Sequence, residues 1–308
     1  MMRLASTLAI ASALVASPAT AQNCDEACLL ELADETLSAI GDQEYRRLPW
    51  ADPVLFTENN VSLMIGDSWW GSAGENTGED DQKALAIADS ETGQVVWFGT
   101  IWDHDEPSFG AVRLKAPEGR IEEIEVIAAR SPWPMVFGEP TEFAFSEAMM
   151  QPVASNQRRS RERLVDLANS YLATKQRNNG TLLARFAPDC AMIENGVQIT
   201  SAELDVDPED RDCASVFESG LFAPVNRIRD RRFPVVDTER GLVMAISVQD
   251  IPAAETTVRT AGGHTATLER PFPMSRLVAE LVKIEGDVVT QSEGVATFLP
   301  YYMPTPWP

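Results

Sequence analysis

Histidine is nearly absent from this sequence, with His104 and His264 the two examples in 308 residues, and cysteine is scarce, with four. Two isolated histidines and four cysteines expected to be oxidised leave too few ligands for a transition-metal site. The sequence also lacks a Gly-rich nucleotide loop after a strand, a G-x-S-x-G nucleophile elbow and an H-E-x-x-H helix. We therefore expect neither a metal nor a cofactor.

Basic residues are also in short supply. Lysine and arginine together number 25 against 47 acidic residues, which gives a formal net charge of −22. A surface of this charge repels phosphate backbones and anionic lipids, so neither nucleic acid nor a membrane surface is expected as a partner. The simplest role of the acidic residues is to keep the protein soluble. The charge does not exclude that the chain forms a homo-oligomer.

Long apolar runs are missing except near the amino terminus. Residues 4–16 are uncharged and apolar, Arg3 precedes them, and the small residues 19–21 follow. This order is typical of a secretory signal peptide spanning residues 1–21, so the mature chain is expected to begin at Gln22. An amino-terminal anchor is the alternative, but the apolar run is too short to span a bilayer comfortably. The protein is expected to be periplasmic or secreted.

The four cysteines all follow the expected cleavage point. Cys190 and Cys213 flank an acidic, turn-rich insertion, and a disulfide between them would stabilise the fold by about 3 kcal/mol. Cys24 and Cys28 lie four residues apart, on one face of an expected helix and near the limit of disulfide reach. A local bridge is the preferred pairing, and a metal site is the alternative that lacks further ligands.

Three blocks of sequence occur twice in the same order. ADPVLFTENNV at 51–61 matches APDCAMIENGV at 187–197. DSETGQVV, starting at Asp89, matches DTERGLVM, starting at Asp237, and LKAPEGRI matches LVKIEGDV further along each copy. Repeated blocks in a fixed order indicate two copies of one domain.

Each copy begins with a helical pattern and continues with hairpins. Apolar residues recur at helical spacing over residues 25–40 and 161–175. Short apolar segments separated by Gly-containing turns then indicate antiparallel strands. The expected strands are 61–66, 84–88, 95–102, 109–116 and 120–129 in the first copy and 233–236, 242–248, 277–284 and 288–298 in the second.

The fold class is therefore α+β, with two tandem domains, each a curved antiparallel sheet packed on helices. The first domain is expected at residues 22–138 and the second at 161–308. A connector at 139–160 joins them, and its Met149 and Met150 are expected to cover the interface between the domains.

Four segments of the mature chain carry a resemblance to a known family. They are the CDEACL start, FTENNVSLMIGDSWWG at 56–71, RRFPVVDTERGLV at 231–243 and LPYYMPTPW at 299–307. This pattern resembles the nuclear transport factor 2-like superfamily, also called SnoaL-like, and within it a secreted subgroup of unknown function. The resemblance implies cone-shaped domains with a pocket at the open end. Members include isomerases, dehydratases, cyclases and epoxide hydrolases as well as binding proteins, and no catalytic motif of the family maps onto this chain.

His104 is the first candidate catalytic residue, with Asp103 beside it in the segment WDHDEP. An adjacent carboxylate can orient an imidazole and raise its pKa, which suits a general base. The alternative is an exposed hairpin turn, because the sequence D-H-D-E-P is rich in residues typical of turns. His264 follows two glycines, so it belongs either to a loop over a pocket mouth or to a plain solvent-exposed loop.

Two further clusters are candidates for ligand binding. Trp69 and Trp70 lie in a Gly-rich polar stretch and would either line a pocket or plug the core. Arg227, Arg229 and Arg231 would share one face of a strand, where guanidinium groups suit a carboxylate or phosphate ligand. Ion pairing with nearby acids is the alternative.

One acidic pair recurs in both copies, as Glu58-Asn59 and as Glu194-Asn195. A repeated acid fits a duplicated catalytic carboxylate. It also fits a turn that recurs because the fold recurs, and this interpretation is simpler.

Two functional hypotheses follow. The first is an exported small-molecule pocket protein, in its sharper form a cofactor-independent acid/base enzyme such as an isomerase, dehydratase or hydrolase. The alternative is a non-catalytic module that binds a ligand or another protein. Cones filled by bulky apolar side chains would favour the module, and a concave site with converging polar groups would favour the enzyme.

Overall fold

The structure is a computed structural model that describes residues 24–74, 84–130, 136–177, 179–200, 212–259, 265–270 and 272–308. The expected signal peptide and His264 lie outside these residues. Within the described ranges, no helix combines the length and apolar character needed to cross a membrane.

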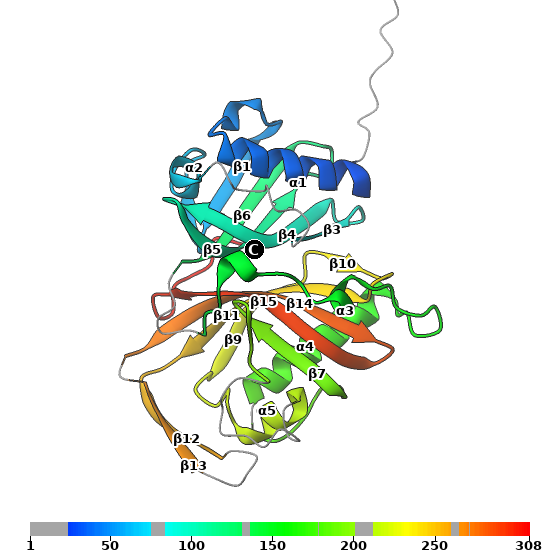
Figure 1. The fold of residues 1–308 in the computed structure, drawn as a ribbon, viewed down its shortest axis with the longest axis vertical. Coiled ribbons are helices and arrows are strands. Elements are labelled where there is room, and N and C mark those ends of the chain that lie inside the picture. Colours follow the sequence, from blue (N-terminus) through cyan, green and yellow to red (C-terminus); the bar gives the residue numbers. More distant parts are fainter. Residues whose placement is uncertain are drawn as a thin grey trace, which may run out of the picture.

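The first half consists of one long helix, short helical turns and a six-stranded sheet (Figure 1). Its elements are α1 (Glu26–Gly41), η1 (Tyr45–Arg47), β1 (Trp50–Glu58), β2 (Val61–Leu63), α2 (Trp69–Ser72), β3 (Leu85–Asp89), β4 (Gln94–Asp103), β5 (Glu106–Lys115) and β6 (Ile121–Ala129). The connector that follows contains η2 (Pro140–Glu142) and α3 (Glu147–Met150).

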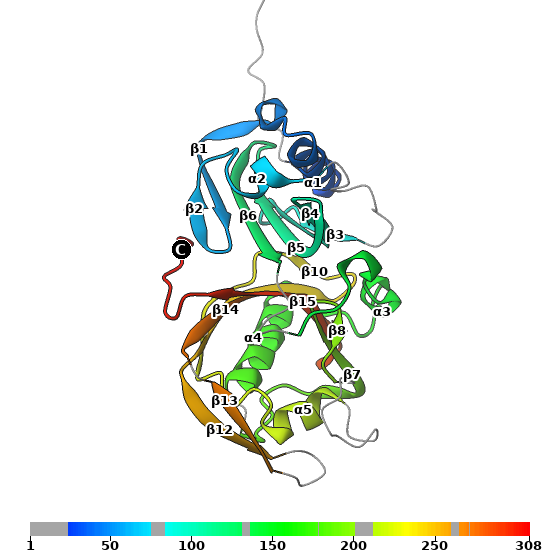
Figure 2. The ribbon, with the colours of Figure 1, turned by 60° about the vertical axis from the view of Figure 1, so that its left-hand side comes forward.

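The second half repeats this plan and adds a projecting hairpin. Its elements are α4 (Arg161–Arg177), β7 (Phe186–Glu194), β8 (Val197–Gln198), α5 (Cys213–Ser219), β9 (Arg227–Arg232), β10 (Val236–Asp237), β11 (Leu242–Ile251), β12 (Ala254–Arg259), β13 (Thr265–Arg270), β14 (Met274–Glu285) and β15 (Val288–Leu299). Strands β12 and β13 pair with each other and extend away from the body of the fold (Figure 2).

Both expected disulfides are present, Cys24–Cys28 and Cys190–Cys213. The first lies at the start of α1, where the Asp25 carboxylate caps the helix by accepting a hydrogen bond from the backbone N–H of Cys28 at 3.0 Å. The second ties β7 to α5. The first bridge therefore fixes the start of α1 in the first core, and the second joins a strand to a helix within the second core.

The two large sheets have corresponding strand orders, β2-β1-β6-β5-β4-β3 and β8-β7-β15-β14-β11-β10. Both sheets are mixed, and the expectation of purely antiparallel sheets was wrong. Strand β1 lies parallel to β6, and β7 lies parallel to β15. The reason is the chain path, because the strand after each long helix returns to lie beside the last strand of the meander.

An asparagine joins these parallel strands in the same way in both sheets. Asn59 follows β1 and exchanges two hydrogen bonds with the backbone of Ala128, at 3.1 and 2.9 Å. Asn195 follows β7 and exchanges two with Ala296, at 3.1 and 2.9 Å. Both asparagines have positive φ, 45° and 46°, which Asn tolerates better than most residues. The recurring Glu-Asn pair therefore forms a structural turn.

Each sheet has an inner face, which packs on the helices of its own half, and an outer face, which packs on the outer face of the other sheet (Figures 1 and 2). Three buried clusters result, one under each set of helices and one between the sheets. The residues between the sheets include Val96, Phe98, Ala111 and Ile127 from the first sheet and Met244, Ile246, Leu277, Leu281 and Val295 from the second. Met149 of the connector belongs to this cluster as expected, whereas Met150, the next residue around the turn of α3, is exposed.

A buried carboxylate lies at the edge of this interface. Glu125 on β6 accepts hydrogen bonds from Arg113 on β5 at 2.9 Å and from Arg232 on β9 at 2.9 and 2.6 Å. The Trp307 ring lies 4.5 Å from the Arg113 guanidinium carbon and 5.4 Å from that of Arg232. Burial alone would raise the pKa of Glu125, but the charges and hydrogen bonds of Arg232 and Arg113 outweigh it, so the pKa is lowered.

Replacing Glu125 with glutamine should destabilise the protein strongly, because two largely buried guanidinium groups lose their shared counter-charge. We expect a loss of about 3 kcal/mol in the free energy of unfolding, measured with urea at neutral pH. The difference from wild type should shrink as the pH falls below about 4, because a carboxyl with a lowered folded pKa loses its stabilising effect on protonation.

Glu122→Gln is the matched control. Glu122 pairs with Lys115 at 3.4 Å, and its side chain is 42% exposed. Loss of an exposed pair should change stability by less than about 1 kcal/mol. Equal effects of the two substitutions would show that the buried network does not hold the halves together.

Candidate functional site

The inner face of the second sheet carries a buried cluster built on α4. Helical spacing directs Tyr171 and Lys175 of this helix towards the sheet. The Tyr171 hydroxyl donates to Glu280 Oε2 at 3.0 Å and lies 2.9 Å from Ser292 Oγ. Lys175 Nζ lies 3.1 and 3.0 Å from the two Glu280 oxygens. One helix and two strands thus bring together a phenol, an ammonium, a carboxylate and a hydroxyl.

These groups are held away from water. Tyr171, Lys175, Glu280 and Ser292 are all buried. Burial raises the pKa of Tyr171 well above its usual value, and the nearby Glu280 charge raises it further. The phenol therefore stays protonated at neutral pH and acts as a hydrogen-bond donor. Lys175 also lies 5.0 Å from the centre of the Tyr171 ring, which adds a cation–π contact.

Further polar side chains lie on the same inner face. Gln249 and Ser247 of β11 alternate with the apolar outer residues of that strand. Arg276 of β14 lies directly opposite Gln249 and forms an ion pair with Glu194 of β7. Ser247 Oγ, both amide atoms of Gln249 and Arg276 Nε are buried and have no hydrogen-bond partner among the described residues. This is an unusual concentration of unmet polar groups.

The matching positions of the first sheet are occupied differently. Strand register aligns the row Glu194, Gly294, Glu280, Ala245 with the row Glu58, Val126, Val112, Trp97. By the same alignment, residues at the positions of Ser292, Ser247 and Gln249 are Ile124, Gly99 and Ile101. The Trp97 ring also covers Gly99, because a Cβ there would lie 2.4 Å from it. The second inner face therefore carries polar side chains at three positions where the first has Ile124, Gly99 and Ile101, and it has Arg276 where the first has Ser108.

Trp69 and Trp70, the expected pocket walls, are fully buried in the first core. Trp69 Nε1 donates to the Trp102 carbonyl at 2.9 Å, and its backbone N–H donates to Glu58 at 2.9 Å. The Trp70 ring packs against the ring of Trp50, with centroids 5.9 Å apart. Both rings thus fill the core, and their contact with a ligand stays a prediction.

His104 and Asp103 do lie in contact, with Nδ1 and Oδ1 2.9 Å apart. His104 and Asp105 form the two-residue turn between β4 and β5, both with positive φ, and the His104 side chain is 80% exposed. Burial would raise the pKa of Asp103, but hydrogen bonds from Ser72 and Arg130 and the Arg130 charge outweigh it and lower the pKa. Asp103 is thus part of an ion pair beneath the turn, and a catalytic role for the two residues remains a prediction.

The arginine-rich strand β9 is bent by a bulge. Arg229 pairs with Val248 and Arg232 with Ile246, so β9 has an extra residue, and Asp230 has φ of 52°. The bulge moves Arg231 to the opposite face from Arg229, so the expectation that they share a face was wrong.

The arginines of β9 therefore have different partners. Arg229 donates to Asp250 at 2.9 Å and to the Met303 carbonyl at 2.7 Å, which ties the strand to the carboxyl-terminal tail. Arg231 bonds Asn169 and Gln176 of α4. Arg227 is exposed. Ion pairing and tail attachment account for Arg229, and ligand binding by Arg227 and Arg229 remains a prediction.

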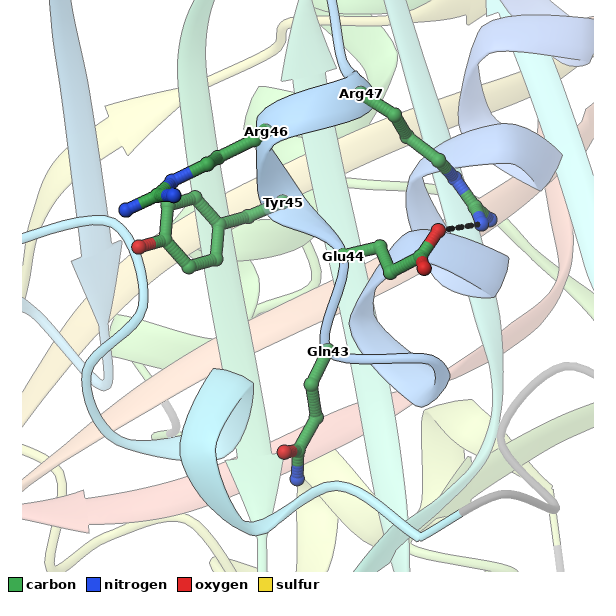
Figure 3. Close-up of a pocket in the computed structure, with 5 residues that line it drawn as sticks. All are labelled: Gln43, Glu44, Tyr45, Arg46 and Arg47. Carbon is green, nitrogen blue, oxygen red and sulfur yellow. Dashed lines mark hydrogen bonds and ion pairs between the residues drawn. The ribbon is translucent and has the colours of Figure 1, made fainter.

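Two surface cavities are weaker candidates for a ligand-binding site. One, of about 500 Å³, is lined by Gln43, Glu44, Tyr45, Arg46 and Arg47 (Figure 3). These residues are consecutive, Arg47 pairs with Glu44 at 3.2 Å, and Arg46 lies over the Tyr45 ring. Their charged groups already have partners, and all the described residues that line the cavity belong to this one segment.

The second cavity, of about 310 Å³, lies between the connector and the edge of the second sheet. Glu293 of β15 lines it together with Glu142, Ser146 and Gln198. Burial raises the pKa of Glu293 to about 7, although hydrogen bonds from Ser146 and Gln291 favour the charged form. Among the described residues, no group of three His, Cys, Asp or Glu side chains is placed to hold a metal ion.

The second half of the chain matches a known family model. A family model described as "Domain of unknown function (DUF8021)" matches residues 157–295, less than half of the chain. A comparison with curated proteins found no match.

Solved structures with partial similarity include AusH from Aspergillus nidulans, with 12% identity, a TM-score of 0.29 and coverage of 45% of this chain and 86% of that one. AclR from Streptomyces galilaeus has 14% identity, a TM-score of 0.30 and coverage of 45% and 91%. BvnE pinacolase from Penicillium brevicompactum has 13% identity, a TM-score of 0.28 and coverage of 44% and 86%. Identities and scores this low say nothing about the chemistry of this chain.

The polar cluster of the second sheet was not found from the sequence, although a signal for it exists. The segment LVMAISVQDI forms β11, and its Ser247 and Gln249 recur with period two inside an apolar run. Glu280 likewise interrupts the apolar run of β14. A polar residue at every second position of a buried strand marks one polar face.

Replacing Glu293 with glutamine should change how stability depends on pH. The folded pKa of about 7 exceeds the usual value of 4.5, so the folded state holds the proton more tightly. The contribution of Glu293 to stability should be greatest below its usual pKa of 4.5 and should be lost as the pH rises through about 7. Because glutamine has no charge, the variant should gain about 3 kcal/mol relative to wild type between pH 4 and pH 8.

Urea unfolding at several pH values measures this effect. Glu142→Gln is the control, because Glu142 lines the same cavity but is exposed, so its profile should follow that of wild type. Parallel profiles for Glu293→Gln and wild type would contradict the assigned burial of this carboxyl.

Proposed function

We propose that this protein binds a small organic molecule on the inner face of its second sheet. The observation that carries the proposal is the set of buried, unpartnered polar groups on that face, contributed by Ser247, Gln249 and Arg276. Unpaired buried groups cost about 1–3 kcal/mol each, so a partner that satisfies them binds favourably. The first half acts as a scaffold, because tryptophan rings and apolar side chains occupy its inner face.

The finer form of the proposal is acid/base catalysis. Tyr171 is a protonated phenol whose hydrogen-bond partner, Glu280, also binds Lys175. A buried carboxylate can take a proton from a ligand and return it, while a neighbouring hydrogen-bond donor stabilises negative charge on a ligand oxygen, which suits isomerisation, dehydration or hydrolysis without a redox cofactor. Glu280 is the proposed proton acceptor, and Tyr171 is the proposed hydrogen-bond donor.

The chain is further proposed to consist of two tandem domains and to be exported. Two tandem nuclear transport factor 2-like domains, at 22–138 and 161–308, would account for the corresponding strand orders and for the repeated asparagine contacts. Export to the periplasm or beyond is supported by the two disulfides, since such bonds persist in oxidising compartments.

Methionine methyl groups offer a direct test of where ligands bind. Met192 lies in the second core, Met149 lies between the sheets and Met64 is exposed on the first half. In a fragment screen on protein with ¹³C-labelled methionine methyls, binding fragments should shift the Met192 signal and leave those of Met149 and Met64 unchanged. Met192→Leu assigns the signal, because this swap conserves volume.

His104→Ala serves as the control for the competing site. The variant should bind the same fragments with the same affinity, because His104 lies in the turn of the first sheet. Fragments that shift Met64 alone, or that are lost in His104→Ala, would move the site to the first half and end this proposal.

A further inference from the structure

The unmet polar groups of the second inner face define a complementary ligand surface. Gln249 is fully buried, and neither its carbonyl oxygen nor its amide nitrogen has a partner among the described residues. Arg276 Nε and Ser247 Oγ are also buried and have no hydrogen-bond partner among the described residues. Together they offer a guanidinium N–H, a side-chain amide and a hydroxyl. This inference rests on the proposed function, because it assumes that a ligand reaches this face.

Strand register fixes how far apart these groups lie. Gln249 and Arg276 are direct cross-strand partners, so their Cβ atoms are about 5 Å apart. Ser247 lies two residues before Gln249 on the same face, about 7 Å away along the strand. The three groups can therefore contact one small ring or a chain of a few heavy atoms.

The two cations of the cluster around Gln249 and Tyr171, Arg276 and Lys175, already have carboxylate partners. Arg276 is paired with Glu194, and Lys175 is 3.0 Å from Glu280. An ionised ligand buried here would bring an uncompensated charge into the core, which is strongly unfavourable. A neutral ligand avoids this penalty, so the pairing of charges selects against carboxylates, phosphates and amines.

The Gln249 side chain then narrows the class of neutral ligand. A carboxamide presents one acceptor oxygen and one donor nitrogen side by side. Its complement is a molecule with an N–H adjacent to a C=O on the same edge, as in a lactam or another cis amide. We propose that the second inner face recognises neutral lactams and related cis amides by paired hydrogen bonds to Gln249, with Arg276 Nε and Ser247 as additional partners of the ligand carbonyl.

Four five-membered or similarly small probes test the proposal on the full mature chain. They are 2-pyrrolidinone, γ-butyrolactone, pyrrolidine as its cation and butyrate as its anion. Affinities are measured by NMR titration. 2-Pyrrolidinone should bind about 10-fold more tightly than γ-butyrolactone, because the lactone lacks the N–H and leaves the Gln249 oxygen unpaired. The two ions should bind more weakly than either neutral ring.

Gln249→Ile is the decisive variant, because the first sheet has Ile101 at the matching position. It should abolish the preference for lactam over lactone. Ser247→Gly, which copies Gly99 of the first sheet, should weaken both neutral probes and keep the preference. Thermal unfolding verifies that each variant is folded. If Gln249→Ile does not fold, the proposal is judged on the ratio of lactam to lactone affinity in the wild type and in Ser247→Gly.

Several results would overturn the proposal. Equal binding of lactam and lactone, tighter binding of either ion, or an unchanged preference in Gln249→Ile would each do so. If none of the four probes binds while other fragments shift the Met192 signal, the amide class fails and the proposed binding site stands. If no probe and no fragment binds, ordered water alone satisfies Gln249, and both proposals fail.

Discussion

The packing of the two sheets against each other through their outer faces is the constraint on which the rest of the structure depends. A sheet can bury only two faces, and here one face of each is committed to the interface. The apolar side chains of this third cluster supply most of the driving force by leaving water. Glu125 and its two arginines then fix the register of the halves, because a buried carboxylate requires its partners in defined positions.

This arrangement leaves each inner face to the helices of its own half, and the two halves use that face differently. In the first half, Trp69, Trp70 and Trp97 fill the space under α1, and the Trp69 indole N–H donates to the Trp102 carbonyl. In the second half, Tyr171 and Lys175 of α4 meet Glu280, and small residues such as Gly294 lie beside them on β15. One half gains stability from apolar packing, while the other retains groups capable of chemistry. Such a division fits a scaffold joined to a functional domain.

Much of the fold could be predicted from the sequence because its signals are local. The long helices, the Gly-containing hairpin turns and the Cys24–Cys28 disulfide follow from spacing over a few residues, and the Cys190–Cys213 disulfide follows from the insertion that its cysteines flank. The structure has each of them. The parallel pairings of β1 with β6 and of β7 with β15 could not be predicted this way, because they join segments far apart in the chain. The bulge at Asp230 was equally hidden, since nothing in the sequence near Arg231 indicates an extra residue.

The candidate site was missed for a different reason. Sequence reasoning favoured rare residue types, His104 and the tryptophan pair, because these stand out in composition. In the structure, His104 lies in an exposed turn and the two tryptophans lie in the first core. The polar cluster consists of common residue types, which stand out only because they are buried. Ser247 and Gln249 look ordinary in the sequence, and only the register that places Gly99 and Ile101 at the same positions of the first sheet shows that polarity there is not required by the fold. Because the first sheet has Ile101 and Gly99 at the positions of Gln249 and Ser247, the fold does not require polar groups there, and the ligand proposed above would account for them.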